Sequence, residues 1–259
     1  MSGGVRDKTP QEKIKKKVKK SLDKAKNMVY NEYIIKREVI KMKNIYCTLD
    51  TETFGGASNP KGIYHLAGII HTRKGEVLAT FNYLISEHYN EIEKDSYAKR
   101  NFHKYADMIA NGIVTSIPTE KMAVEMVNNL CEFYGVNVMT AYNSGFDFVK
   151  TECRELLNGR QFIDTWLMAL QTIATKKSYE KFCVENGYLT KKRSLQTSAE
   201  VVYRFLTSNT DFIEEHTAFE DSKIEMQIFL ECLKMHKKFT QNTHCFDMEN
   251  SYKLFKKVA

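Results

Sequence analysis

The chain has 259 residues, of which 42% are apolar, and a formal net charge of +7 at neutral pH. A chain of this length builds a hydrophobic core without disulfides or a structural metal, and its composition excludes intrinsic disorder, collagen-like repeats and a disulfide scaffold. The six cysteines show no CxxC spacing, which indicates buried thiols in a reducing compartment. No apolar run reaches the length of a membrane span and the N-terminus lacks an apolar signal core, so we expect a cytoplasmic protein.

The positive charge is concentrated in the first 26 residues. Ten of the 39 basic residues and three of the 32 acidic residues lie there, which leaves 29 of each sign in the rest of the chain. Thr9-Pro10-Gln11-Glu12 matches a capping box, and apolar residues recur at three- and four-residue spacing from Ile14 to Val29. Residues 1–40 are therefore predicted to form a basic helical arm. The arm either binds nucleic-acid phosphates or a partner protein, or it is a solvated helix whose apolar stripe packs on the main domain.

Strands are predicted first in the main domain. Residues 43–52 alternate between two sets of side chains, as in a strand that buries one face. After a glycine-rich loop, apolar runs at residues 63–71 and 77–85 are joined by Arg73-Lys74-Gly75, which is typical of a hairpin. A three-stranded meander is therefore expected.

Helices and short strands alternate in the rest of the main domain. A helical pattern begins near Glu91, and further helices are expected at residues 117–134, 146–157, 179–185, 195–206 and 217–237. Short strands are expected at residues 136–141 and 161–164. This order predicts an α/β domain at residues 41–237, with a mixed five-stranded β-sheet flanked by α-helices, and a tail at residues 238–259.

Acidic residues and a histidine lie at the ends of predicted elements. Asp50 and Glu52 are two residues apart on a strand, so both carboxylates point to one face of the sheet. Asp147 lies in the first turn of a predicted helix, where the positive end of the helix dipole favours an anion. His216 opens the last long helix and Asp221 lies within it. Taken singly, each residue also fits an ordinary structural role.

In combination, these motifs resemble those of the DEDDh (DnaQ-like, DNA polymerase III epsilon-type) 3′–5′ exonucleases, a family with an RNase H-like fold. Leu49-Asp50-Thr51-Glu52-Thr53 is similar to the first motif, residues 141–147 (AYNSGFD) to the second, and residues 216–221 (HTAFED) to the third. The resemblance covers about residues 44–233. It implies a 3′–5′ exonuclease that acts on single-stranded DNA or frayed duplex ends and releases nucleoside 5′-monophosphates.

Charge repulsion gives a physical reason for metal ions at such a site. Four carboxylates that converge repel one another by roughly 4 kcal/mol per pair at an effective dielectric constant near 20. They make sense together only if they bind cations, and oxygen ligands with a phosphate substrate favour Mg²⁺ or Mn²⁺ over zinc. Two ions about 4 Å apart can serve both the attacking and the leaving oxygen of a phosphodiester.

The resemblance also assigns roles to individual residues. It implies that Asp50 bridges two metal ions, that Glu52 and Asp221 complete the site of the ion that holds the nucleophile, and that Asp147 supports the other ion. His216 would be the general base that takes a proton from water. Candidate contacts to the 3′-terminal nucleotide are Thr53, Phe54, Gly55, Tyr142, Asn143 and Phe146.

Two positions depart from the family pattern. Tyr142 stands where many members have a histidine, and His65 stands where an acid or an amide is common. Neither position supplies a metal ligand in the family, so the departures bear on substrate preference. One alternative is an RNA 3′-end trimming exoribonuclease of the same family. Another is a non-catalytic protein that tethers nucleic acid to a polymerase or another replication protein through the basic arm, although the complete set of acids favours an enzyme.

A zinc clip is a minor alternative near the C-terminus. Its four candidate ligands are Cys232, His236, His244 and Cys245. Cys232 and His236 are four residues apart on one helix face, but two adjacent ligands are difficult to place around one tetrahedral ion.

Overall fold

The computed structural model describes residues 44–55, 60–95 and 98–235. The predicted basic arm at residues 1–40 and the tail at residues 238–259 lie outside these ranges. Among the described residues, no helix combines the length and the apolar composition that a membrane span requires. The five cysteines in the described ranges are buried free thiols, as the sequence predicts.

A mixed β-sheet forms the centre of the described fold. β1 (Ile45–Phe54), β2 (Gly62–Thr72) and β3 (Val77–Ile85) pair as an antiparallel meander. β5 (Val138–Ala141) pairs parallel to β1, and β6 (Gln161–Asp164) pairs parallel to β5. This arrangement confirms the predicted mixed α/β class.

The predicted number of strands was wrong by one. Within the described residues the sheet has six strands, in the order β4-β3-β2-β1-β5-β6. The additional strand, β4 (Thr115–Ile117), pairs parallel to β3 at the edge of the sheet. It has only three residues and two of them are exposed, so no alternation of apolar residues marks it in the sequence.

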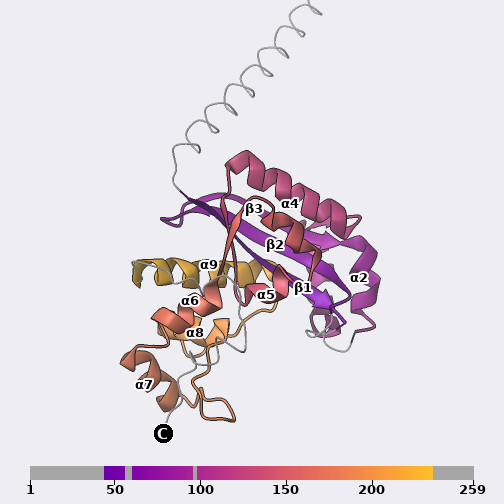
Figure 1. The fold of residues 1–259 in the computed structure, drawn as a ribbon. Coiled ribbons are helices and arrows are strands. Elements are labelled where there is room, and N and C mark those ends of the chain that lie inside the picture. The colour runs from indigo at the N-terminus through magenta and orange to yellow at the C-terminus, as the bar shows by residue number, and fades with distance from the viewer. Residues whose placement is uncertain (1–43, 56–59, 96–97, 236–259) are drawn as a thin grey trace, which may run out of the picture. The chain divides into compact units, whose positions relative to one another are not determined.

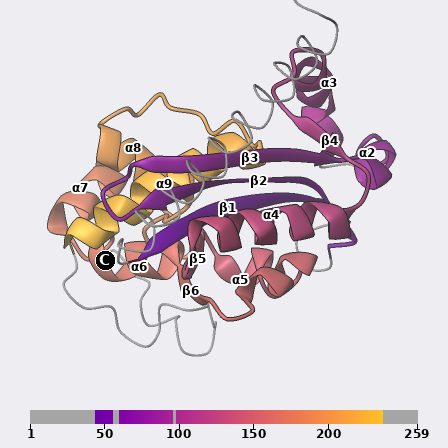
Figure 2. The ribbon, with the colours of Figure 1, turned by 90° about the horizontal axis from the view of Figure 1, so that it is seen from above.

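Helices connect and cover the strands. The α-helices are α2 (Ser86–Ile92), α3 (Phe102–Ala110), α4 (Glu120–Tyr134), α5 (Ser144–Asp147), α6 (Thr165–Thr172), α7 (Lys177–Glu185), α8 (Ala199–Thr207) and α9 (Ala218–Met235). Two short 3₁₀ helices are η1 (Ala98–Asn101) and η2 (Glu152–Leu157). Figures 1 and 2 show α4 on one face of the sheet and α9, with α6, α7 and α8, on the other.

Capping residues decide where several helices begin. Asp164 caps α6, because its Oδ1 accepts the amide hydrogens of Trp166 (2.9 Å) and Leu167 (3.2 Å). Ser198 caps α8, so the helix begins at Ala199 and not near residue 195 as predicted. The predicted helix at residues 146–157 is two short elements, since Thr151 adopts an extended backbone and begins η2.

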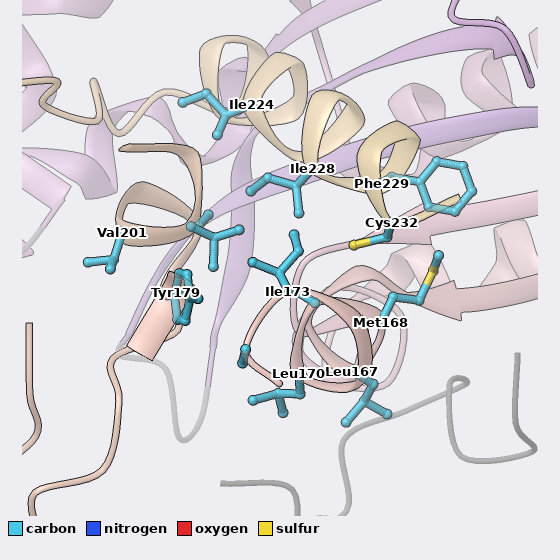
Figure 3. Close-up of a cluster of buried hydrophobic side chains, with 14 of the residues drawn as sticks. Leu167, Met168, Leu170, Ile173, Tyr179, Val201, Ile224, Ile228, Phe229 and Cys232 are labelled. Carbon is cyan, nitrogen blue, oxygen red and sulfur yellow. The ribbon is translucent and has the colours of Figure 1, made fainter. Parts of the chain in front are cut away.

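The two faces of β1 contact different helices. Tyr46 packs against Phe229 of α9, with ring centroids 5.0 Å apart. The next residue, Cys47, points to the other face, where the neighbouring Cys131 of α4 and then burial raise the pKa of its thiol. The core on the α9 side continues between α6 and α9, where Met168 and Ile173 lie across from Ile228 and Cys232 (Figure 3). Since side chains alternate along a strand, Asp50 and Glu52 share the face of Tyr46.

Gly68 occupies a position in the middle of β2 that has no room for a side chain. A Cβ atom there would lie 2.5 Å from Cζ of Phe81 and 2.6 Å from the backbone oxygen of Thr48. We expect Gly68→Ala to lower the free energy of unfolding by about 3 kcal/mol, because the rigid neighbouring strands must move apart. Urea denaturation measures this change, and a loss below about 0.5 kcal/mol would contradict the packing described for β1, β2 and β3.

Candidate metal centre

Three of the four predicted carboxylates meet at one end of β1. Oxygen atoms of Asp50, Glu52 and Asp221 all lie within 4.8 Å of one another. Asp50 and Glu52 come from one face of β1, and Asp221 comes from the first turn of α9, which packs on that face. Asp50 and Glu52 are half-buried and Asp221 is buried. The side chains are therefore close enough to ligate one shared cation.

Asp147 lies beside this group without being part of it. Its side chain is only 2% exposed, and the Thr51 hydroxyl donates a hydrogen bond to its Oδ1 at 2.6 Å. Burial and the nearby charge of Asp50 raise its pKa well above the usual value, whereas the Thr51 hydrogen bond lowers it. From α5, the fourth predicted acid therefore repels the carboxylates of Asp50 and Glu52.

The electrostatics of the group favour positive charge. Burial, followed by repulsion from Glu214, raises the pKa of Asp50 to about 7. Burial, followed by repulsion from Asp50, raises the pKa of Glu52 well above its usual value. For Asp221 the pKa rises to about 10, first through burial and then through Asp50 and Glu214. Each carboxyl resists ionisation without a counter-charge, so a bound cation would stabilise the ionised group.

The donor set fits a hard divalent cation. The Oδ1 atom of Asp221 is buried and has no hydrogen-bond partner within the described part of the chain. A buried carboxylate oxygen without a partner destabilises the fold, whereas a metal ion would satisfy it. Oxygen ligands alone are the donors that Mg²⁺ and Mn²⁺ prefer.

Two further acids lie at the centre and were not predicted. Glu225 is 4% exposed, accepts the Tyr142 amide hydrogen at 3.1 Å, and has a pKa that burial and then Asp50 raise well above the usual value. Glu214 has a pKa of about 7 through burial and then Glu200. The sequence carries a signal for Glu225, because it lies one helical turn after Asp221. It carries none for Glu214, which precedes α9 in a loop.

His216 lies next to the centre on the loop that enters α9. Its backbone is left-handed (φ 54°), and its side chain is 49% exposed. Its Nδ1 atom is 3.8 Å from a carboxylate oxygen of Glu214. This placement leaves the imidazole accessible to a ligand beside the carboxylates.

A cavity of about 670 Å³ opens beside His216. Two of the predicted substrate contacts, Tyr142 and Asn143, line it together with Glu214, His216 and Glu225. The Tyr142 hydroxyl donates to the Thr197 backbone oxygen at 2.6 Å, and its ring is stacked on Trp166 with centroids 6.4 Å apart. Tyr142 is therefore held in place and presents a fixed wall.

The other predicted substrate contacts do not line this cavity. Thr53, Phe54 and Gly55 form the end of β1 and the turn after it, and Phe146 lies in α5. The Phe54 ring packs against His88 with centroids 5.1 Å apart. The Gly55 amide donates to Asp95 at 2.9 Å, and its φ of +92° is one that glycine readily adopts. These contacts hold the turn in place, and its role in substrate binding stays a prediction.

The zinc alternative falls mostly outside the described residues. Cys232 is buried, and its sulfur accepts a hydrogen bond from the Thr172 hydroxyl at 3.3 Å. His236, His244 and Cys245 lie beyond residue 235, so the structure does not test this site.

Comparisons with known proteins give only distant similarities. No protein-family model matches the sequence, and no curated protein matches it. One similar solved structure is a full-length 3′-exonuclease, with 13% identity and a TM-score of 0.47 over 85% of this chain and 92% of that chain. Another is cell-death related nuclease 4 (CRN-4), with 12% identity and a TM-score of 0.42 over 74% of this chain and 64% of that chain. These likenesses are too distant to assign an activity, so function has to follow from the site itself.

Proposed function

We propose that this protein is a metal-dependent 3′–5′ exonuclease that removes nucleoside 5′-monophosphates from the 3′ end of single-stranded DNA or of a frayed duplex. The observation that supports this proposal most is the meeting of Asp50, Glu52 and Asp221 within 4.8 Å. These residues come from the first and third sequence motifs, and Asp147 of the second motif repels the carboxylates of Asp50 and Glu52. A purely architectural protein has no reason to keep so many mutually repelling acids at one site.

The carboxylates provide the binding site for divalent cations. Asp50, Glu52 and Asp221 would hold the ion that they share, and Asp147 would support a second one. When bound, such ions lower the charge barrier to attack on a phosphodiester and stabilise the leaving oxygen. The partly buried surroundings of these acids strengthen their interaction with positive charge.

His216 is the proposed general base. Its exposed imidazole, on the loop beside the carboxylates, would accept a proton from the attacking water. The water oxygen forms a bond to phosphorus, the bond between phosphorus and the 3′ oxygen of the preceding nucleotide breaks, and that oxygen takes up a proton. The 3′-terminal residue then leaves as a 5′-monophosphate.

A side-by-side assay tests this function. Single-stranded DNA, duplex DNA with frayed ends and single-stranded RNA, each labelled at the 3′ end, are incubated with the full-length protein and Mg²⁺. We expect labelled mononucleotide as the first product from the DNA substrates, and EDTA should abolish its release. Substrates labelled at the 5′ end should instead give a ladder that shortens one nucleotide at a time.

Each of the other outcomes of this assay would point to a different function. Preferential release from RNA would replace the DNA assignment by RNA 3′-end trimming. Internal cuts would contradict the exonuclease proposal, and binding without any release would favour the tethering alternative. The roles of the basic arm in phosphate binding or polymerase binding stay predictions.

A further inference from the structure

His65 is a buried histidine on β2 that touches the start of α9. Its side chain is fully buried, and its Nδ1 atom lies 3.2 Å from the backbone nitrogen of Ala218, the first residue of α9. Its Nε2 atom lies 2.6 Å from Oδ1 of Asn82 on β3, and Nδ1 also lies 3.3 Å from the Tyr105 hydroxyl. His65 therefore links the sheet to the helix that carries Asp221.

The tautomer of His65 follows from its neighbours. The Asn82 side-chain amide donates to the Ile113 backbone oxygen at 3.0 Å, so Oδ1 of Asn82 is the atom left to face His65. An oxygen accepts, and Nε2 of His65 must therefore carry the proton and donate it. Nδ1 is then a bare acceptor for the Ala218 amide. Burial lowers the His65 pKa to about 4, which agrees with a neutral ring.

The ring replaces the usual cap of this helix. The first amide groups of a helix have no partner inside the helix and are ordinarily satisfied by a preceding side chain. Thr217 precedes α9, but its hydroxyl oxygen is buried without a hydrogen bond in the described part of the chain. His65 on β2 instead accepts the amide hydrogen of Ala218. Ala218 lies three residues before Asp221 and two residues after His216.

The same region of β2 touches the strand carboxylates. His65 pairs with Glu52 across the β1–β2 ladder, and the hydroxyl of its neighbour Tyr64 donates to Glu52 at 3.5 Å. The rings of Tyr64 and His65 both meet Tyr105 edge to face, with centroids 5.6 Å and 5.1 Å apart. One buried cluster thus contacts Glu52 and the origin of the helix that bears Asp221.

We propose that His65 is a positioning residue of the metal centre. By accepting the Ala218 amide hydrogen it fixes the start of α9 against the sheet, and this holds Asp221 at the distance from Asp50 and Glu52 that a shared cation requires. The inference rests on the proposed function, since the centre is taken to bind a divalent cation. It concerns a residue whose hydrogen-bond partners are Ala218, Asn82 and Tyr105, so it acts on the position of Asp221 through the start of α9.

Two substitutions separate positioning from packing. In His65→Asn the amide oxygen can occupy the place of Nδ1 and accept the Ala218 hydrogen, whereas in His65→Gln the amide reaches the place of Nε2 and leaves Ala218 without an acceptor. Both variants remove the same ring and should lower the melting temperature similarly. Mn²⁺ affinity is measured by calorimetric titration of the full-length protein, and kcat and KM are measured with a labelled oligonucleotide.

We expect His65→Gln to weaken Mn²⁺ binding about 10- to 100-fold, in line with other residues that orient ligands, with a fall in kcat and little change in oligonucleotide KM. His65→Asn should stay within about threefold of wild type. The matched control is His71→Gln, a buried histidine on the same strand whose ring nitrogens face Thr48 and Thr72, and it should leave Mn²⁺ affinity unchanged. If His65→Gln does not fold, Asn82→Ala, which frees the tautomer, should weaken Mn²⁺ binding in the same direction.

Equal Mn²⁺ affinities in His65→Gln and His65→Asn, or an equal loss in His71→Gln, would overturn the inference. The outcome is distinguishable from failure of the proposed function. If the wild-type protein releases no nucleotide but the Mn²⁺ pattern holds, the positioning role stands and the exonuclease proposal fails. If nucleotide is released and the Mn²⁺ pattern is absent, the exonuclease proposal stands and the positioning role of His65 fails.

Discussion

Replacing Asp50 by asparagine is expected to abolish Mg²⁺-dependent nucleotide release and, at the same time, to raise the melting temperature of the metal-free protein. Asp50 lies within 4.8 Å of Glu52 and Asp221, and the site loses a shared ligand without it. In the metal-free protein the ionised form of the same carboxylate destabilises the fold, because burial and repulsion from Glu214 raise its pKa to about 7. Relief of even about 1–2 kcal/mol of this penalty would raise the melting temperature by about 3–6 °C.

The sign of the pH dependence follows from the direction of the shift. The folded protein binds the Asp50 proton more tightly than the unfolded chain does, whose pKa lies near 3.8. The stability of the metal-free wild type should therefore fall as the pH rises from about 4 to about 7, through the ionisation of this group. Asp50→Asn removes that loss of stability. The melting temperature of the metal-free variant should therefore exceed that of the wild type by little near pH 4 and by most at or above pH 7.

Thermal denaturation at pH 5 and pH 8, with EDTA or with Mg²⁺, measures these effects. Mg²⁺ should raise the melting temperature of the wild type and have little effect on Asp50→Asn. Asp107→Asn is the matched control, because Asp107 is an exposed acid on α3 outside the centre, and it should behave as the wild type. Wild-type rates of nucleotide release in Asp50→Asn would overturn the metal centre as the site of catalysis.

Asp147→Ala should also lose activity in a folded protein, since Asp147 is the remaining predicted ligand.

Replacing His216 by alanine is expected to lower kcat by about 10²-fold or more, the usual contribution of a positioned base. The side chain is 49% exposed, so its loss creates no cavity. Because the backbone at this position is left-handed, His216→Asn is a useful second variant, since asparagine tolerates that conformation better than alanine does. Both variants should keep Mn²⁺ affinity near that of the wild type, because His216 is not one of the proposed ligands.

The pH–rate profile separates a base from a structural residue. In the wild type, kcat should rise with pH as the base loses its proton, and this limb should disappear in both His216 variants. His103→Ala removes an exposed histidine from α3 and should leave the profile unchanged. An unaltered profile in His216→Ala, or an equal effect in His103→Ala, would count against the proposed base.

The local sequence was enough to predict the strands and most of the helices around the centre. Alternation along residues 45–52 predicted that Asp50 and Glu52 share one face of the strand, and in the structure α9 packs on that face. Asp164 begins α6 in the same local way, because its short side chain accepts the first amide hydrogens of the helix. Such features depend on residues that are near in sequence, so they can be recognised without the fold.

Long-range contacts decided what the sequence did not. β4 forms because its three residues pair with the edge of β3. Leu195 lies outside α8 because it forms a β-bridge with Leu189. Neither partner is specified by the pattern of the segment itself, since pairing depends on which backbone groups the fold brings opposite each other.

By itself, the sequence determined the α/β class, most of the strands and the acids that could share a cation, because side-chain periodicity and capping act within a few residues. Only the tertiary structure decided that Glu214 and Glu225 lie among those acids and that His65 holds the start of α9. Burial and electrostatic repulsion depend on distances between segments, and His65 and Ala218 are 153 positions apart. A charge or an acceptor acquires its role when folding removes water from around it.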